Sequence, residues 1–265
     1  MNDDMMFYPR RPAIFVLTAT DHGPMIVNRF DFHSDDGGRS AVGVGFDLLN
    51  YSNYDEGQLG LLCKLVEMRR EAFGDGVVAI DGGANIGVYT LTLARLMTGW
   101  GSVIAFEPYK WAYRMLCGNI CLTNALNAEP IQAALGNNNG TTAIEWIDPR
   151  VPRNFGGIHL NKRIEGPSEE VQLCTIDGFN LKRLDLLKLD IEGMELEALE
   201  GAQETIKRCH PIICAEHIFC GSEPLQTGLE RMGYSVNRTE MNMVAIHGDD
   251  PVNKRVTWYD SRKAA

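Results

Sequence analysis

The sequence predicts an α/β fold in which a mostly parallel sheet is covered by helices on both faces. Three short apolar segments carry this prediction, at residues 77–80, 102–106 and 184–189. They are largely apolar, as expected for strands that are buried on both faces of a parallel sheet. Helix-periodic sequence follows the first and the third, and strands that alternate with helices are typical of βαβ units. We therefore expect one main domain around a parallel sheet.

A glycine-rich turn joins the first of these strands to its helix. Residues 81–87 contain Gly82, Gly83 and Gly87, which permit positive φ and a close approach of the backbone to a ligand. The packing face of the helix then follows at helical spacing, with Ile86, Thr90, Leu93, Ala94 and Met97. A strand, a tight turn and a helix in this order are typical of a nucleotide-type cofactor site.

Two further details indicate which cofactor the turn suits. Asn85 stands where the dinucleotide fingerprint has its second glycine, which disfavours a pyrophosphate ligand. Glu107 ends the second strand 20 residues after Gly87 (107 − 87), where a ribose-binding carboxylate belongs. Asp81 can meet an ammonium group of the ligand, or it can only tie down the turn by accepting backbone N–H groups. This combination fits S-adenosylmethionine better than NAD.

Acidic residues gather at the carboxyl end of the third strand, where open α/β sheets bind ligands. Lys188 and Asp190 share a strand face because side chains alternate, so Asp190 is either a functional acid in the crevice or the partner of Lys188. Glu192 and Glu195 stand at the start of the next helix, where they can act in the site or interact only with the helix dipole. The packing face of that helix is Leu196, Leu199, Ala202 and Ile206.

A further apolar strand, at residues 210–217, ends in Glu216 and His217. Alternation places these two side chains on opposite faces, so we expect only one of them to point directly at a substrate. Histidine, with a pKa of about 6.5, is suited to act as a general base, and a structural role is its alternative. Asp190, Glu216 and His217 are therefore the candidate bases, with Glu192 behind them.

The same side chains offer ligands for a divalent cation. A Mg²⁺-like ion held by carboxylates would lower the pKa of an acceptor hydroxyl. The candidate ligands come from separate strands, however, and no compact motif such as a His-Glu-x-x-His helix occurs. Cys117 and Cys121 lie one helical turn apart without a matching second pair. The sequence thus assigns no metal, and Mg²⁺ remains the less favoured alternative.

Six motifs in a characteristic order carry a family resemblance. They lie at residues 81–87, 106–108, 175–177, 185–195, 199–202 and 211–216. Together they resemble the FkbM family of S-adenosylmethionine-dependent methyltransferases over roughly residues 50–248. The resemblance implies a Rossmann-like, seven-stranded methyltransferase sheet, closed by an antiparallel strand pair at residues 234–238 and 241–246. It also implies O-methylation, mostly of sugar hydroxyls and other small-molecule hydroxyls.

The resemblance also assigns the cofactor contacts. The methionine side of the cofactor would be lined by Gly83, Ala84, Asn85, Gly87 and Thr90. Glu107 would hold the ribose, and the adenine would be flanked by Pro108, Ala133 and Ala134. Many methyltransferases of this fold place an acid near the adenine amino group, but residues 132–136 contain none.

The chemistry follows from the cofactor, because its sulfonium methyl group is already activated. The protein has to hold an acceptor oxygen in line with the methyl–sulfur bond and remove its proton. We expect transfer to a hydroxyl of a small molecule, with a sugar or a glycosylated metabolite favoured. The alternatives are a nonsugar acceptor (a lipid, a polyketide or a peptide carboxylate), a noncatalytic cofactor-binding module and an NAD-dependent dehydrogenase.

The chain divides into three segments. Residues 1–66 are predicted to form a hairpin, at 12–32, and the start of a helix that extends from residue 57 to 73. Tyr51, Tyr54 and Glu56 can serve as a lid, or they are surface aromatics and an acid at the start of a helix. Residues 67–248 form the S-adenosylmethionine-binding domain. Within it, the 148–169 stretch is a predicted substrate loop. Its side chains at Arg150, Arg153, Asn154 and His159 can form hydrogen bonds to an acceptor, or they only solvate an exposed loop. Residues 249–265 read as a polar tail.

Composition excludes several classes of partner. The 265 residues carry a net charge of −10, which argues against binding to nucleic acid. No run of about 18 apolar residues and no basic-then-apolar leader occurs, so we expect neither a membrane span nor secretion. The seven cysteines lack regular spacing. These observations predict a reduced, cytoplasmic protein.

Overall fold

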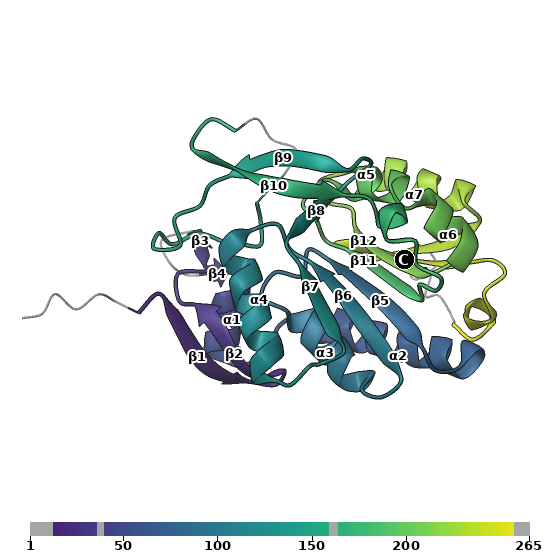
Figure 1. The fold of residues 1–265 in the computed structure, drawn as a ribbon, viewed down its shortest axis with the longest axis horizontal. Coiled ribbons are helices and arrows are strands. Elements are labelled where there is room, and N and C mark those ends of the chain that lie inside the picture. Colours follow the sequence, from purple (N-terminus) through teal and green to yellow (C-terminus); the bar gives the residue numbers. More distant parts are fainter. Residues whose placement is uncertain (1–12, 36–39, 159–163, 257–265) are drawn as a thin grey trace, which may run out of the picture.

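A computed structural model describes residues 13–35, 40–158 and 164–256 and confirms the predicted α/β fold (Figure 1). Its centre is a seven-stranded sheet with the order β13-β14-β12-β11-β5-β6-β7. The strands are β5 (Val77–Gly82), β6 (Gly101–Phe106), β7 (Ala128–Ile131), β11 (Leu186–Leu189), β12 (Ile212–Glu216), β13 (Tyr234–Arg238) and β14 (Asn242–His247). β14 runs antiparallel to both of its neighbours, and the other paired strands of this sheet are parallel. The predicted closing pair is thus β13 and β14.

Helices cover both faces of this sheet, as predicted (Figure 1). One face carries α2 (Glu56–Phe73), α3 (Val88–Leu96) and α4 (Lys110–Leu122). The other face carries α5 (Glu195–Glu200), α6 (Gln203–Cys209) and α7 (Ser222–Arg231). Successive strand side chains enter opposite cores, so Ala79 packs under the first group of helices and Ile80 under the second.

The helix predicted after the third strand is divided into α5 and α6. Its predicted packing residues Leu199, Ala202 and Ile206 are buried, but a close contact interrupts the helix. A Cβ atom at Gly201 would lie 2.0 Å from the Gly136 carbonyl oxygen, so only glycine fits at this position. Asp177 then accepts hydrogen bonds from the backbone of Thr205 (2.7 Å) and Glu204 (3.1 Å) and caps α6.

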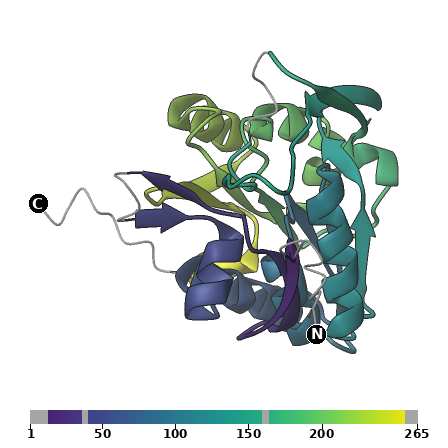
Figure 2. The ribbon, with the colours of Figure 1, turned by 90° about the vertical axis from the view of Figure 1, so that its left-hand side faces the viewer.

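The N-terminal hairpin is confirmed as β1 (Phe15–Thr20) and β2 (Gly23–Asn28). It is followed by the short pair β3 (His33–Asp35) and β4 (Ser40–Val42) and by α1 (Val44–Tyr51). The hairpin lies beside α4 (Figures 1 and 2). There the Asn119 carboxamide accepts from the Ile26 backbone N–H (2.6 Å) and donates to its carbonyl (3.1 Å). The predicted segment boundary at residue 66 lies within α2, which joins this region to the core.

A second sheet was not predicted. It contains β8 (Ala133–Leu135), β10 (Ser168–Cys174) and β9 (Gly140–Glu145), in that order. Ala133 therefore belongs to this sheet and does not end a strand of the central sheet. β9 and β10 are largely polar and exposed, and they bury only a small cluster that includes Ile144, Val171 and Leu173. They thus lack the apolar runs by which the other strands were recognised.

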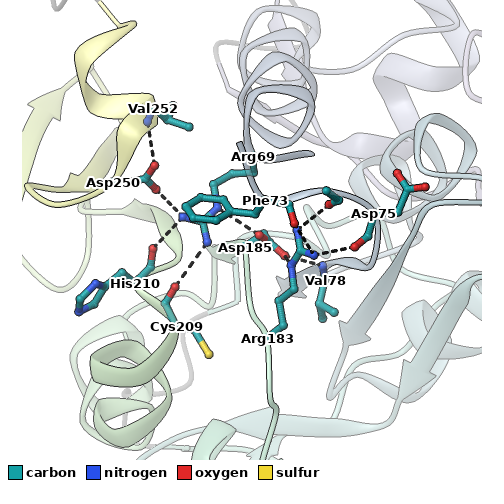
Figure 3. Close-up of polar contacts among 11 residues, drawn as sticks. Arg69, Phe73, Asp75, Val78, Arg183, Asp185, Cys209, His210, Asp250 and Val252 are labelled. Atoms are coloured by element: carbon teal, nitrogen blue, oxygen red, sulfur yellow. Dashed lines mark hydrogen bonds and ion pairs between the residues drawn. The ribbon is translucent and has the colours of Figure 1, made fainter. Parts of the chain in front are cut away.

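A buried ion-pair network closes the end of the sheet where β5 and β11 begin (Figure 3). Asp185 accepts hydrogen bonds from Arg69 Nε (3.1 Å), Arg183 Nε (2.7 Å) and the backbone N–H of Val78 (2.9 Å). Arg69 also pairs with Asp250, which precedes the 3₁₀-helix η2 (Pro251–Lys254). The start of the predicted polar tail is therefore part of the fold. Residues 257–265 lie outside the described residues.

Two sequence expectations concern covalent links and membranes. All seven cysteines are free thiols. Of the helices within the described residues, none combines the length and the apolar character needed to cross a membrane.

Candidate functional site

A cavity of about 340 Å³ opens at the carboxyl ends of β5, β6, β11 and β12. This is the edge where parallel sheets bind ligands. Most of the residues singled out from the sequence line it: Gly83, Ala84, Asn85, Glu107, Pro108, Ala133, Asp190, Glu192 and Glu216. The predicted cofactor and acid groups therefore share one cavity.

The glycine turn lies against the ends of two neighbouring strands. The backbone N–H groups of Gly83 and Ala84 both donate to the Phe106 carbonyl at the end of β6 (3.0 and 2.9 Å). Gly83 has a φ of +76°, and a Cβ atom there would lie 1.8 Å from the Asp190 carbonyl oxygen. Only glycine fits this contact. The turn and the residue that ends β11 are thus in direct backbone contact.

Glu107 lies at the end of β6 and is only 4% exposed. Its two carboxylate oxygens accept hydrogen bonds from the backbone N–H groups of Asn85 and Tyr109, both at 2.8 Å. Each oxygen keeps a lone pair that a ribose hydroxyl can use. Burial raises the pKa of Glu107 to about 7, against the opposing effect of these two N–H groups. The carboxylate is therefore held in one orientation by the turn that it also stabilises.

Asp81, Gly87 and Thr90 are not among the described residues that line the cavity, although they were predicted as cofactor contacts. Asp81 is fully buried, accepts a hydrogen bond from the Thr90 hydroxyl (2.7 Å) and pairs with Lys188 Nζ (3.1 Å). Gly87 precedes α3 with a φ of +99°, and a Cβ atom there would lie 2.7 Å from the Leu116 side chain. These three residues therefore support the residues that line the cavity and do not line it themselves.

Lys188 is the cation of the site, and it is 2% exposed. Its ammonium lies 3.1 Å from Asp81 and 3.7 Å from Asp190, and 4.7 Å from the centre of the Tyr89 ring. Burial alone lowers the pKa of Lys188, but the two carboxylates raise it above its ordinary value, so the ammonium stays charged. Asp190 is thus one partner of Lys188, and the buried Asp81 is the closer one.

Asp190, Glu192 and Glu216 form the acid cluster of the cavity. Their ligand oxygens all lie within 4.8 Å of one another. Glu192 adopts a left-handed backbone (φ 56°) in a turn held by Glu195, whose buried carboxylate accepts from the backbone N–H groups of Ile191 (3.0 Å) and Gly193 (3.2 Å). Glu195 therefore supports the cluster from the first turn of α5. Such a set of oxygens can accept a proton or surround a hard cation.

Glu216 has the acid–base properties expected of a proton acceptor. Burial raises the pKa of Glu216 to about 8, and the neighbouring carboxylates of Asp190 and Glu195 add to this shift, while Lys188 opposes it. A pKa near the working pH suits a general base because the group can take up a proton and release it again.

We expect the ligand-free protein to lose stability as the pH rises from about 4.5 to about 8. A carboxyl with a raised pKa binds its proton more tightly in the folded state, so its stabilising contribution is complete below the unfolded pKa and is lost as the pH rises through the folded pKa. For Glu216 this loss runs from about pH 4.5, the ordinary pKa of the carboxyl, up to its folded-state pKa of about 8, and Glu107 adds a loss that ends near pH 7.

Thermal unfolding tests this expectation. The Tm should fall by about 2–4 °C across the range, which is roughly 1 kcal/mol for a domain of this size. This fall in Tm is well below the one that the full pKa shift of Glu216 would give, because Glu216 is partly solvated. The Glu216→Gln variant should show a flatter profile, and a wild-type Tm that does not change with pH would contradict the prediction.

His217 does not reach the cavity, in contrast to its prediction as a candidate base. It is 5% exposed and is not among the described residues that line the cavity. Its backbone N–H donates to the Met241 carbonyl (3.0 Å), and its Nε2 lies 3.2 Å from the Thr239 carbonyl oxygen. Alternation along β12 turns Glu216 toward the cavity and His217 away from it. His217 instead joins the loop after β12 to the β13–β14 turn.

The N-terminal segment supplies part of the cavity wall, including two residues, Asp55 and Gln58, that were not predicted from the sequence. Tyr54, Asp55 and Gln58 line the cavity. The Tyr89 hydroxyl donates to the Asp55 carboxylate, and Gln58 bridges Cys214 Sγ (3.3 Å) and the Asn242 side chain (2.6 Å). Of the predicted lid residues, Tyr54 lines the cavity, while Tyr51 and Glu56 are exposed.

The predicted substrate loop contributes only some of its predicted polar residues. Asn154 lines the cavity, together with residues 155–158. Arg150 pairs with Asp148, and Arg153 makes a two-pronged pair with Glu145 (2.6 and 2.9 Å), so neither guanidinium is directed by the fold to a substrate. His159 lies outside the described residues.

A single buried carboxylate fixes this loop. Asp31 is 3% exposed and accepts hydrogen bonds from the backbone N–H groups of Phe155 (2.9 Å) and Gly45 (2.8 Å). It thereby holds the loop and the start of α1 on the same side of the cavity. Burial raises the pKa of Asp31 to about 6, although both N–H groups lower it.

Two known methyltransferases are similar to this chain in sequence. Methyltransferase sdnD of Sordaria araneosa is 29% identical over 157 residues, which cover 47% of this chain and 60% of the relative. Methyltransferase 1 of Beauveria bassiana is 28% identical over 153 residues, which cover 50% and 61%. The chain thus spans about 60% of the length of these relatives.

Solved structures and a family model extend the comparison. The solved structure of an FkbM methyltransferase from Methylobacillus flagellatus aligns with this chain with a TM-score of 0.46 and 19% identity over 64% of this chain and 43% of that one. The family model for the methyltransferase FkbM domain matches residues 81–236, which include the glycine turn and the acid cluster. This chain belongs to the FkbM family of methyltransferases.

Proposed function

We propose that this chain transfers the methyl group of S-adenosylmethionine to a hydroxyl of a small molecule. Its family implies S-adenosylmethionine as the methyl donor. The observation that carries the proposal of a hydroxyl acceptor is the acid cluster, because Asp190, Glu192 and Glu216 converge within 4.8 Å in the cavity that also contains Glu107. A hydroxyl needs such an acceptor for its proton, whereas a module without chemistry does not.

The order of the strands supports a direction for the bound donor. Glu107 follows β6 and Glu216 ends β12, and these strands are separated by β5 and β11. Three strand spacings of about 4.8 Å place the two strands roughly 14 Å apart. We assign the ribose to Glu107, the methionine portion to the backbone of the glycine turn, and the reacting end to the acid cluster.

The chain's own residues then provide positioning and proton removal. S-adenosylmethionine supplies an activated methyl group when it is bound. Gly83 permits the close backbone approach, and the charged Lys188 holds Asp190 beneath the reacting centre. Glu216 accepts the hydroxyl proton as the acceptor oxygen forms its bond to the methyl carbon and the carbon–sulfur bond breaks.

The identity of the acceptor and the setting of the enzyme are part of the same proposal. The family resemblance favours a sugar or a glycosylated metabolite, and the carboxylates and the Asn154 amide suit hydrogen bonding to hydroxyls. The N-terminal segment, residues 1–66, would close one side of the cavity through Tyr54 and Asp55. We place the reaction in the cytoplasm.

The experiment is transfer of a radiolabelled methyl group to a panel of hydroxyl acceptors by the wild type and by Glu216→Gln. We expect kcat to fall about 100-fold in the variant, the low end of the contribution of a positioned base, because Asp190 and Glu192 lie close enough to take over part of its role. Affinity for S-adenosylhomocysteine should be nearly unchanged.

The control is Glu230→Gln on the exposed side of α7, which should transfer methyl groups like the wild type. Each assay is run with EDTA and with added Mg²⁺. Activity that disappears in EDTA and returns with Mg²⁺ would make the acid cluster a metal site instead of a base. An unchanged kcat in Glu216→Gln would reject Glu216 as the proton acceptor.

A further inference from the structure

Three large apolar side chains stand exposed beside the acid cluster. Ile218, Phe219 and Met241 line the cavity and are 48%, 46% and 51% exposed. We call them the apolar wall. They come from the loop after β12 and from the turn between β13 and β14. Apolar surface that is left exposed at the mouth of a cavity is typical of a ligand-binding groove.

The two loops that carry the apolar wall are held firmly together. His217 bonds to the Met241 carbonyl through its backbone and to the Thr239 carbonyl through its ring, as described above. Within the turn, the Thr239 hydroxyl and the Asn242 backbone exchange hydrogen bonds at 2.9 and 3.0 Å. In the loop, the Gly221 N–H donates to the His217 carbonyl (3.1 Å). The wall is therefore a preformed surface.

The apolar wall continues directly from the acid cluster. Ile218 follows Glu216 by two residues, and Met241 precedes Asn242, which pairs with Glu216 across β12 and β14. A molecule whose hydroxyl reaches Glu216 therefore has the apolar wall beside its adjoining atoms. By contrast, other exposed apolar residues such as Leu126 and Leu17 do not line this cavity.

We propose that the acceptor carries its reactive hydroxyl on an apolar skeleton, such as an alicyclic or aromatic ring, which packs on Ile218, Phe219 and Met241. This inference rests on the proposed function, because it takes the acid cluster as the acceptor end of the cavity. It replaces the free sugar that the family resemblance favours with a nonsugar acceptor or with the apolar part of a glycosylated metabolite. Contact with a preformed apolar surface favours binding in proportion to the apolar area removed from water. A free polyol would leave the wall in water and lose that gain.

The test uses two alcohols with the same ring of six carbons. Cyclohexanol has one hydroxyl and an apolar ring, whereas inositol has a hydroxyl on every carbon. Binding of each to the protein loaded with S-adenosylhomocysteine is measured by ligand-observed NMR. We expect cyclohexanol to bind at least about tenfold more tightly than inositol. Phe219→Ser and Met241→Ser should each reduce this preference several-fold, and the matched control Leu126→Ser should retain it.

The possible results are decisive. Three results would overturn the inference. In the first, inositol binds as tightly as cyclohexanol; in the second, cyclohexanol does not bind at all; in the third, the preference for cyclohexanol survives in Phe219→Ser and Met241→Ser. Calorimetry with S-adenosylhomocysteine on each variant separates these results from a failure of the cofactor site. If the wild type does not bind S-adenosylhomocysteine, the proposed function fails; if it binds but shows no preference for the apolar alcohol, only this inference fails.

Discussion

Replacing Glu107 with alanine is expected to weaken binding of S-adenosylhomocysteine by at least about 100-fold. A hydrogen bond to a charged group contributes roughly 1.5–3 kcal/mol, and two ribose hydroxyls can donate to this carboxylate. Loss of both bonds removes about 3 kcal/mol or more, and each 1.4 kcal/mol is a factor of ten in the dissociation constant. Truncation also leaves the N–H groups of Asn85 and Tyr109 without their acceptor.

Calorimetric titration at pH 8 measures this effect, with two comparison variants. Glu107→Gln keeps one acceptor oxygen and should lose less affinity than Glu107→Ala. Glu129→Ala removes an exposed carboxylate from β7, the neighbouring strand, and should bind like the wild type. If Glu107→Ala binds S-adenosylhomocysteine as tightly as the wild type, Glu107 does not hold the ribose and the cofactor does not lie as proposed.

Replacing Arg69 with methionine is expected to lower the free energy of unfolding by about 3–5 kcal/mol. Arg69 and Asp250 are both buried, and removing one partner of a buried ion pair leaves an uncompensated charge. Asp185 keeps Arg183 and the Val78 N–H, so the loss falls mainly on Asp250 and on the attachment of η2 to α2. Urea denaturation of the two proteins gives the difference.

The adjacent residue provides the control for Arg69. Arg70 pairs with Asp75 on the surface, where both side chains are largely exposed, so Arg70→Met should cost less than about 1 kcal/mol. The double variant with Asp250→Asn should recover part of the stability lost in Arg69→Met, because the unpaired charge is removed as well. Equal stability of Arg69→Met and Arg70→Met would contradict this account of the network.

Features encoded by short stretches of sequence could be predicted. The strand, turn and helix at residues 77–97 are specified by an apolar run, by glycines that need positive φ, and by helical spacing. Glu107, Asp190 and Glu216 were found because each comes at the end of an apolar strand, and the carboxyl ends of parallel strands meet at one edge of a sheet. Local pattern and this one topological rule suffice for the acid cluster.

Features that depend on contacts between distant segments could not be predicted. The pairing of Asp81 with Lys188 joins residues 107 positions apart (188 − 81) and turns Asp81 from a candidate ligand contact into a buried counterion. His217 looked like a base because imidazole titrates near neutrality, but its orientation follows from the alternation of β12 and from contacts with a later turn. No periodicity in the sequence carries that information.

The backbone contact between Gly83 and Asp190 belongs to the part of the cavity that the fold must keep, whereas other parts of the cavity wall can vary. Main-chain atoms of residues that directly follow the adjacent strands β5 and β11 make this contact, so it fixes the distance between the glycine turn and Asp190. The surfaces that we propose for the rest of the acceptor lie in residues 154–158, 218–219 and 241, all in connections that follow strands. Substitutions there can redirect the enzyme to new acceptors without disturbing transfer itself. A single fold can thus keep one reaction while the acceptor molecules change.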